Sequence, residues 1–345
     1  MSNDPVALEQ ELMRIVDAFV VLSPVSFQFG GEPPVQADAI PAFIANLPSH
    51  PIPPDPLVRG IQSTLYSRCY MKRIDDPPTP VLPSSPDFPG VLSAANVAQE
   101  RWDSGWQVYQ VGQNGVVFAA KGDRRRSAVP GEYISTGTPG FAPAAGSYVT
   151  LRVARESHTT QNGFYFMFSE ILPDMFDDSS LVRFYFHATP ECARDLIAHL
   201  THVLNRYMIP YRMKALSDPP LYGRTDAAVL YSARRYFAIV TRLLHAIPDE
   251  IVTRLGSATP LFTTVLRRGI GVAEEPNTGE SFGMHRCRLV AEGIVDAWRQ
   301  GQVSSVARLR AIAARFMSNG LRLDRPHMNS GSVDLSATPA EGVAA

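Results

Sequence analysis

The chain has 345 residues and a formal net charge of -1, with 32 basic residues balancing 33 acidic ones. This length suits one large domain or two modest ones, and the balanced charge excludes an overall basic surface of the kind that binds nucleic acid or membranes. No apolar run approaches the ~18 residues of a membrane helix, and the acidic opening lacks the basic start of a signal peptide. We therefore expect a cytoplasmic protein with neither a nucleic-acid partner nor a membrane partner.

Cysteine and lysine are scarce in this composition. The three cysteines lie far apart, at Cys69, Cys192 and Cys287. This spacing predicts neither a zinc site nor a disulfide framework. The 32 basic residues include only three lysines, Lys72, Lys121 and Lys214, which leaves 29 arginines. Because a guanidinium does not release its proton at neutral pH, each retained lysine is a candidate base.

The first part of the chain is predicted to be a helical, proline-rich lobe over residues 1–92. Asp4 is a suitable N-cap and Pro5 a suitable first residue for an amphipathic helix over about 5–22. A second helix is expected over 56–72. Sixteen of the 29 prolines fall in the first 90 residues, so the connections around these helices are predicted to be irregular.

From residue 93 the apolar pattern shifts toward a period of two, which is typical of strands. Two hairpins are predicted, one joining 106–111 to 115–121 and one joining 146–154 to 163–169 across an Asn-Gly turn. Further strands are expected at 181–188, 209–216 and 226–232, and helices at 191–206, 233–247, 280–299 and 303–318. The pattern predicts an α+β fold: a mixed, largely antiparallel sheet with flanking helices over 93–322, followed by a disordered tail over 323–345.

The strand at 181–188 alternates strictly between two kinds of side chain. Val182, Phe184 and Phe186 share one face, and Arg183, Tyr185 and His187 share the other. The first face is expected to join the core. The second is a candidate site.

Common catalytic motifs are missing from the sequence, including a Walker A loop, HExxH and GxSxG. The sequence instead contains the segments SAANVAQERWDSGW (93–106), PGEYIS (130–135), GFYFMF (163–168), RFYFHATPE (183–191), RMKALSDPPLYGRTDAAVLY (212–231) and PLFTTVLRRGIGVAEEPNTGESFGMHR (260–286). In these segments, over roughly residues 90–300, the chain resembles the HopA-type type III effector family. Within that family it is most similar to the stand-alone lyase subunits of class V lanthipeptide and related ribosomal-peptide pathways.

The resemblance implies a fold similar to the phosphothreonine lyase effectors and a β-elimination reaction. Phosphate would leave a phosphoserine or phosphothreonine of a precursor peptide, giving dehydroalanine or dehydrobutyrine. The implied partners are that phosphorylated peptide and a separate small Ser/Thr kinase of the same pathway. No metal or cofactor is required.

The same resemblance implies the site residues. In the family, one strand carries a cation, and a lysine on the following strand serves as the base. Lys214 matches that lysine, and Arg212 shares its strand face, which favours the neutral amine that must accept the α-proton. In the family pattern the cation stands two residues before the histidine that acts as general acid, whereas Arg183 and His187 are four residues apart. The general acid is therefore either His187 or Tyr185. The residues expected to bind phosphate or substrate are Arg183, Arg224, Tyr231, Arg286 and Lys121.

Structural roles compete with several of these assignments. Lys214 is a candidate for a salt bridge with Asp218, and Arg224 for one with Asp226. Tyr231 is a candidate for plain packing, and Lys121 for a solvated position at a strand end. At the level of the whole protein, a binding protein or scaffold of the same fold that catalyses nothing rivals the lyase. A phosphatase is a further rival, although it needs a nucleophile or a metal that the sequence does not display.

Overall fold

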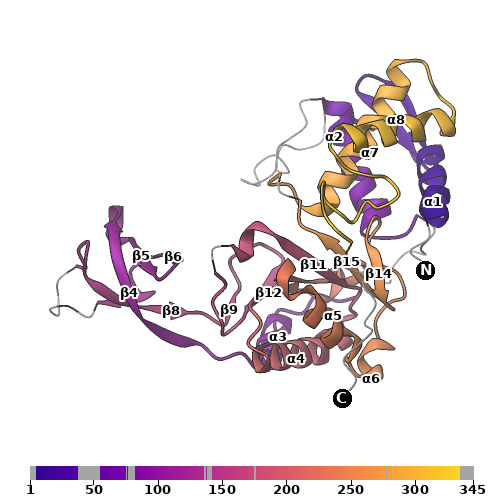
Figure 1. Ribbon diagram of the computed structural model, residues 1–345. Coiled ribbons are helices and arrows are strands. Elements are labelled where there is room, and N and C mark those ends of the chain that lie inside the picture. Colours follow the sequence, from indigo (N-terminus) through magenta and orange to yellow (C-terminus); the bar gives the residue numbers. More distant parts are fainter. Residues whose placement is uncertain are drawn as a thin grey trace.

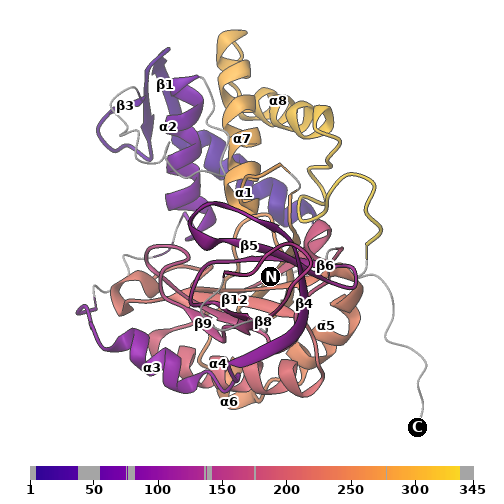
Figure 2. The same ribbon diagram turned by 90° about the vertical axis from the view of Figure 1, so that its left-hand side faces the viewer.

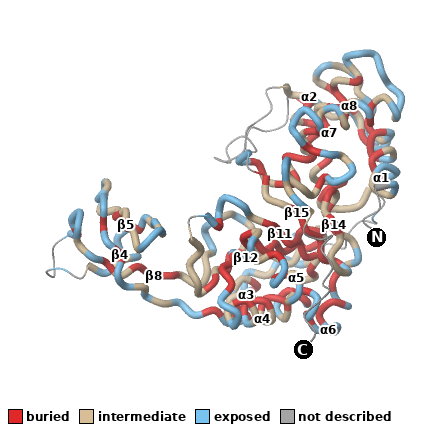
Figure 3. Tube along the Cα trace, viewed as in Figure 1, coloured by how far each residue is buried: buried red, intermediate tan, exposed pale blue. Residues whose placement is uncertain are grey.

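A computed structural model describes residues 5–37, 55–74, 76, 82–135, 137, 142–174, 176–276 and 278–334. A seven-stranded sheet forms the centre, with a five-stranded sheet beyond one end and a group of helices beyond the other (Figure 1). Buried residues concentrate in the central sheet and in the helices packed on it (Figure 3). Within the described residues no helix is long and apolar enough to cross a bilayer.

The central sheet has the strand order β14-β15-β11-β13-β12-β10-β9, and each neighbouring pair is antiparallel. Its strands are β9 (Glu156–Ser157), β10 (Phe164–Phe168), β11 (Leu181–Phe186), β12 (Tyr211–Leu216), β13 (Ala228–Ala233), β14 (Thr264–Arg267) and β15 (Ile270–Glu274). The expected α+β class is confirmed. Both β14 and β15 escaped the sequence-based prediction.

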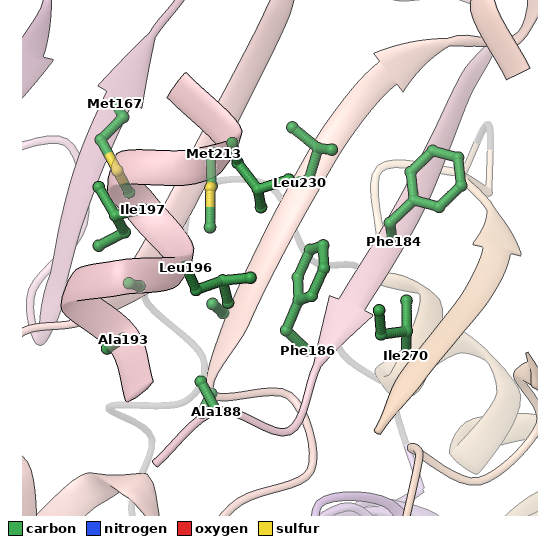
Figure 4. Packing of buried hydrophobic residues seen from close by; sticks show 14 of the residues in the cluster. Met167, Phe184, Phe186, Ala188, Ala193, Leu196, Ile197, Met213, Leu230 and Ile270 are labelled. Carbon is green, nitrogen blue, oxygen red and sulfur yellow. The ribbon is translucent and has the colours of Figure 1, made fainter. Parts of the chain in front are cut away.

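One face of this sheet is covered by helices that follow or precede its strands. They are α3 (Phe88–Ala95), α4 (Pro190–Arg206), α5 (Phe237–His245) and α6 (Asp249–Val252). Thr189 caps α4 by accepting a hydrogen bond from the amide of Cys192, as a threonine before a proline does at a helix start. Leu196 of α4 and Phe184 and Phe186 of β11 meet in this core (Figure 4). The predicted inward face of β11 is therefore correct.

The other face of the sheet is covered only in part, by a second group of helices. This group contains α1 (Pro5–Ala18), α2 (Pro56–Leu65), its π-helical continuation η3 (Tyr66–Tyr70), α7 (Phe282–Arg299) and α8 (Ser305–Ser318). Their core includes Tyr185 and Val229 of the sheet. The N-terminal helices thus pack with α7 and α8 from the far end of the chain, so the helical lobe is built from both chain ends. The domain boundaries themselves stay predictions.

The five-stranded sheet has the order β6-β5-β4-β8-β7 and is also antiparallel. Its strands are β4 (Arg101–Val111), β5 (Val117–Lys121), β6 (Arg124–Ala128), β7 (Tyr133–Ser135) and β8 (Tyr148–Val153). The predicted hairpin of 106–111 with 115–121 is present as β4 and β5. A small core around the fully buried Trp106 holds this sheet together. Figure 2 shows it in front of the central sheet.

The second predicted hairpin, 146–154 with 163–169, is wrong. Strand β8 pairs with β4 and β7 in the five-stranded sheet, whereas β10 pairs with β9 and β12 in the central one. The Asn-Gly turn lies between β9 and β10. The apolar residues Val149 and Leu151 of β8 are buried in the core around Trp106, so that core determines the partner of β8.

Two further predictions are corrected at the chain ends. The first helix stops at Ala18 rather than near residue 22, and β1 (Phe19–Ser23), β2 (Ser26–Phe29) and β3 (Val35–Gln36) follow as a small sheet. Disorder was predicted over 323–345, but residues up to 334 are held by hydrogen bonds. Asn329, for example, donates its backbone amide to a carboxylate oxygen of Glu274 and its side-chain amide to the Glu275 carbonyl, both at 2.7 Å. Residues 335–345 lie outside the described residues.

Candidate functional site

Polar side chains gather on the part of the central sheet that the second helix group leaves uncovered. In the strand register, Arg212 of β12 lies opposite Tyr231 of β13, and Tyr231 lies opposite Arg183 of β11. Directly opposite residues of antiparallel strands point to the same face. The three side chains therefore form one row across three strands. Lys214 stands in the next row, opposite Val229.

Tyr231 lies between two guanidinium groups. The Cζ atoms of Arg183 and Arg212 are 5.0 and 4.8 Å from the centre of its ring. Both distances are within the range of a cation–π contact. The two arginines flank β13 from neighbouring strands, which places their backbones about 10 Å apart. The ring of Tyr231 is therefore held between two guanidinium groups.

The two arginines of this row differ in whether a carboxylate pairs with them. Arg183 is buried and forms a two-pronged ion pair with Glu275. Arg212 is exposed, and among the described residues it has no carboxylate partner. Its guanidinium donors are the ones available to a ligand in this row. The sequence pattern indicated Arg212 only as a neighbour of Lys214 and did not reveal its open guanidinium.

Lys214 is half-buried beside aromatic rings and an amide. Its Nζ donates to Oε1 of Gln161 at 3.0 Å and lies 4.2 Å from the ring centre of Phe164. The competing salt bridge with Asp218 does not form. Asp218 instead accepts hydrogen bonds from the Ser84 hydroxyl at 2.6 Å and the Ser85 amide at 3.0 Å. Gln161 sits in the turn before β10, and nothing in the sequence marked it as a partner of this lysine.

A cavity of about 430 Å³ adjoins the Arg212 row and extends to the five-stranded sheet. Arg212, Tyr231 and Phe168 line it from the central sheet. Arg126, Ala128 and Leu151 line it from the five-stranded sheet. Its volume is within the usual range for small-molecule and peptide side-chain sites. Tyr231 thus reaches a cavity, which goes beyond plain packing.

The remaining arginines proposed from the sequence, Arg224 in the loop before β13 and Arg286 on α7, are already engaged. Arg224 pairs with both oxygens of Asp226, at 2.8 and 2.9 Å, so the competing structural role is the observed one. Arg286 is fully buried and donates to the carbonyls of Pro326 and Met328, at 2.7 and 2.9 Å. Burial lowers the pKa of Arg286 to about 10, which leaves it charged at neutral pH. Neither guanidinium shares the row of Arg212.

The two proton donors proposed from the sequence are also covered. Tyr185 is 1% exposed and lies against Tyr70 and Phe282, with ring centres 6.5 and 6.3 Å away. Burial raises the pKa of Tyr185, while Arg183 opposes this shift. Tyr185 occupies the row of Lys214, because both residues lie opposite Val229.

His187 follows β11 and lies one row further from Arg212 than Tyr185. Its Nδ1 is 3.1 Å from the carbonyl oxygen of Ala258. A Cβ at Gly256 would come within 2.3 Å of the ring, so the backbone of this loop packs directly on the imidazole. Burial lowers the pKa of His187, which favours the neutral ring.

Lys121 lies in the five-stranded sheet, apart from the Arg212 row. Its Nζ pairs with Asp103 at 3.0 Å, and Asp103 also pairs with Arg101. The structure therefore brings together Lys214, Tyr185, Tyr231 and Arg183 of the proposed residues, and it adds Arg212. Lys121, Arg224, Arg286 and His187 have other neighbours. Among the described residues, no group of three His, Cys, Asp or Glu side chains converges on a possible metal position.

Comparisons with known proteins identify the family. Two solved structures are similar, both described as effector proteins of Pseudomonas syringae. The one from pathovar tomato strain DC3000 is 19% identical, with 78% of this chain and 90% of that chain covered and a TM-score of 0.42. The one from pathovar syringae strain 61 is 14% identical, with 96% and 99% covered and a TM-score of 0.46. A search of curated proteins found no match. The model of the HopA1 effector protein family matches residues 155–328, just over half of the chain and all of the central sheet. The chain therefore belongs to the HopA1 effector protein family.

Proposed function

We propose that this protein is a lyase that eliminates phosphate from phosphoserine or phosphothreonine in a ribosomal precursor peptide. The product would be dehydroalanine or dehydrobutyrine, as in lanthipeptide-type biosynthesis, and a separate kinase would supply the phosphorylated peptide. The observation that carries the proposal is the placement of a lysine on the same strand face as an open arginine that lines a cavity. Lys214 and Arg212 are two residues apart on β12, so their side chains rise from points about 7 Å apart.

The two side chains suit the two groups that an elimination removes, the phosphate and the α-proton. A phosphate monoester carries close to two negative charges, and the exposed guanidinium of Arg212 can bind its oxygens in a bidentate manner. The α-carbon of the same phosphoserine is only a few bonds from the phosphorus. This geometry would place the α-hydrogen toward Lys214 while Arg212 holds the phosphate. Arg183, paired with Glu275, would hold the ring of Tyr231 from the far side.

In the proposed reaction the neutral amine of Lys214 removes the α-proton. The electron pair of that C–H bond forms the new Cα=Cβ bond, the Cβ–O bond breaks, and phosphate departs with the bond's electrons. Charge that grows on the leaving oxygens is stabilised by Arg212. The hydrogen bond from Lys214 to the neutral amide of Gln161, in place of a carboxylate, is compatible with an amine that must lose its proton.

Protonation of the leaving phosphate is assigned to Tyr231 in this proposal. The sequence offered Tyr185 and His187, but Tyr185 is covered by Tyr70 and Phe282 and His187 by the Gly256 loop. Tyr231 lines the cavity between two guanidinium groups. Tyr231→Phe should therefore lower turnover more than Tyr185→Phe, since only the first removes a hydroxyl that adjoins the phosphate position.

Mass spectrometry of a phosphorylated peptide substrate tests the reaction. The test incubates the protein with a phosphoserine peptide from a precursor encoded near its gene, and with the Lys214→Ala variant as a control. Elimination leaves a peptide one water lighter than its serine form and releases phosphate. Recovery of the serine form would show a phosphatase, and an unchanged phosphopeptide that nevertheless binds would favour the scaffold alternative.

A further inference from the structure

Among the described residues, the five-stranded sheet ends in a strand with a free edge. Strand β6 is the last in the order β6-β5-β4-β8-β7, and in this part of the chain it pairs with β5 alone. Every second backbone N–H and C=O of an edge strand points away from its one neighbour. The free side of β6 can therefore accept another extended segment as an added strand.

This edge carries three consecutive arginines, Arg124, Arg125 and Arg126. Within the described residues none of them pairs with a carboxylate. Arg125 lies over the ring of Tyr109, with its Cζ 5.8 Å from the ring centre, and Arg126 donates to the backbone carbonyl of Arg125 at 3.2 Å. Residues 101–153 contain six basic and three acidic residues, a formal charge of +3 in a chain whose total is -1. The five-stranded sheet is thus positively charged within a nearly neutral chain, and the three β6 arginines are available to an acidic ligand.

The direction of the arginine side chains connects this edge with the candidate site. Side chains alternate along a strand, so Arg124 and Arg126 share one face and Arg125 has the other. Arg126 and Ala128 line the cavity whose opposite wall includes Arg212 and Tyr231. A segment laid along β6 would have cations above and below it. One end of it would also lie beside the cavity that leads to Arg212.

We propose that the free edge of β6 binds an extended acidic segment of the peptide substrate by strand addition. The identity of the peptide rests on the proposed lyase function, but the binding mode does not. Backbone hydrogen bonds would supply affinity without regard to sequence, and the three arginines would select acidic side chains. The adjoining cavity would then receive a neighbouring residue of the same peptide. Charged residues on an edge strand also prevent self-association. The experiment must therefore distinguish strand addition from attraction by charge alone.

Binding of a labelled acidic peptide to the full-length protein tests the proposal. The probe is a fluorescein-labelled peptide of about ten residues, a usual upper length for a strand, with alternating Glu and Val. It has no serine or threonine, so it cannot be a lyase substrate, and failure of the lyase reaction would leave this result intact. Two comparison probes complete the set: the same peptide with every second amide N-methylated, and a peptide of alternating Lys and Val.

The expected result is anisotropy-detected binding of the Glu-Val peptide that weakens about tenfold when all three β6 arginines become alanine, since each exposed ion pair contributes modestly. N-methylation should weaken binding by a similar factor, and the Lys-Val peptide should not bind. The control is a variant that also removes three exposed arginines, all on helices: Arg194→Ala, Arg206→Ala and Arg310→Ala. Its affinity for the Glu-Val peptide should stay within about twofold of the wild type. Melting temperatures of both variants confirm that each is folded.

Three results would overturn the proposal. Equal binding of the N-methylated probe would mean that charge alone holds the peptide, without strand addition. Equal weakening in the two triple variants would mean that the attraction is not located at β6. Tighter binding of a single-stranded DNA oligonucleotide through the same arginines would assign the edge to nucleic acid instead.

Discussion

Two regions at the central sheet differ in how they hold arginine. Arg183 of β11, Arg224 in the loop before β13 and Arg286 of α7 are held by Glu275, Asp226 and backbone carbonyls. At the open end, Arg212 contacts an aromatic ring and Lys214 contacts rings and an amide. A guanidinium with an internal partner must give up that partner before it binds phosphate, whereas an open one need not. The comparison therefore separates arginines that stabilise the fold from Arg212, whose guanidinium is open to a ligand.

The largest effect is expected at Lys214. Lys214→Ala should lower the rate of elimination by ~10³-fold, because general-base catalysis is worth roughly 10² to 10⁴. Lys214→Arg should lose as much, since a guanidinium stays protonated. Single-turnover mass spectrometry of a phosphopeptide measures both rates.

Lys121→Ala provides the matched control for this prediction. Its ammonium pairs with Asp103 in the five-stranded sheet, so its removal should leave the elimination rate near that of the wild type. If Lys214→Arg retains elimination while Lys121→Ala abolishes it, the base is misassigned.

The next largest effect is expected on stability, at Arg224. Arg224→Ala leaves the carboxylate of Asp226, which is 6% exposed, without its partner. Loss of one member of a buried pair costs about 3 to 5 kcal/mol, and some remaining exposure of Arg224 favours the lower value. Urea unfolding measures this change in free energy.

A double variant sharpens the interpretation of Arg224. Arg224→Ala with Asp226→Ala should recover part of the lost stability, because no unpaired charge then remains buried. An Arg224→Ala protein that keeps wild-type stability but no longer binds phosphopeptide would return Arg224 to the ligand site.

A smaller effect is expected on ligand binding at Arg212. Arg212→Ala should weaken phosphopeptide binding about ten- to hundredfold, the value of one charge-assisted hydrogen-bond pair, and should leave the melting temperature unchanged. Calorimetry in the Lys214→Ala background prevents turnover during the titration. Phosphopeptide affinity that is indifferent to Arg212 would remove the feature that distinguishes the open end from the covered one.

The smallest effect concerns pH, within the covered region. Burial, together with Arg286 and Arg288, lowers the pKa of His285 to about 3. In the unfolded chain His285 is protonated below about pH 6.5, whereas in the folded chain it stays neutral down to about pH 3. The contribution of His285 to stability is therefore complete above pH 6.5 and is lost as the pH falls below that value. Between pH 7.5 and 5.5 this histidine should account for about 1.4 kcal/mol of lost stability.

Thermal or urea unfolding at the two pH values checks the contribution of His285. In His285→Gln the loss between pH 7.5 and 5.5 should be smaller than in the wild type, whatever the stability of the variant at pH 7.5. An identical pH dependence in the two proteins would contradict a neutral, buried His285.

The sequence alone was sufficient for the features that depend on local pattern. Alternation in LVRFYFHA correctly separated Phe184 and Phe186, which are in the core, from Arg183 and Tyr185 on the opposite face. Period and capping also located α4, which begins directly after Thr189. These predictions succeed because a strand or helix distributes its side chains by its own geometry, without reference to distant residues.

Only the tertiary structure decided which segments and charges meet. Strand β8 joined the five-stranded sheet rather than β10, because burial around Trp106 outweighs proximity along the chain. Residues 326–334, polar enough to suggest disorder, are ordered by contacts with Arg286 and Arg234. The sequence likewise could not distinguish Arg212 from Arg183. Whether a guanidinium finds a carboxylate depends on residues such as Glu275, 92 positions away, and such a pairing leaves no trace in local pattern.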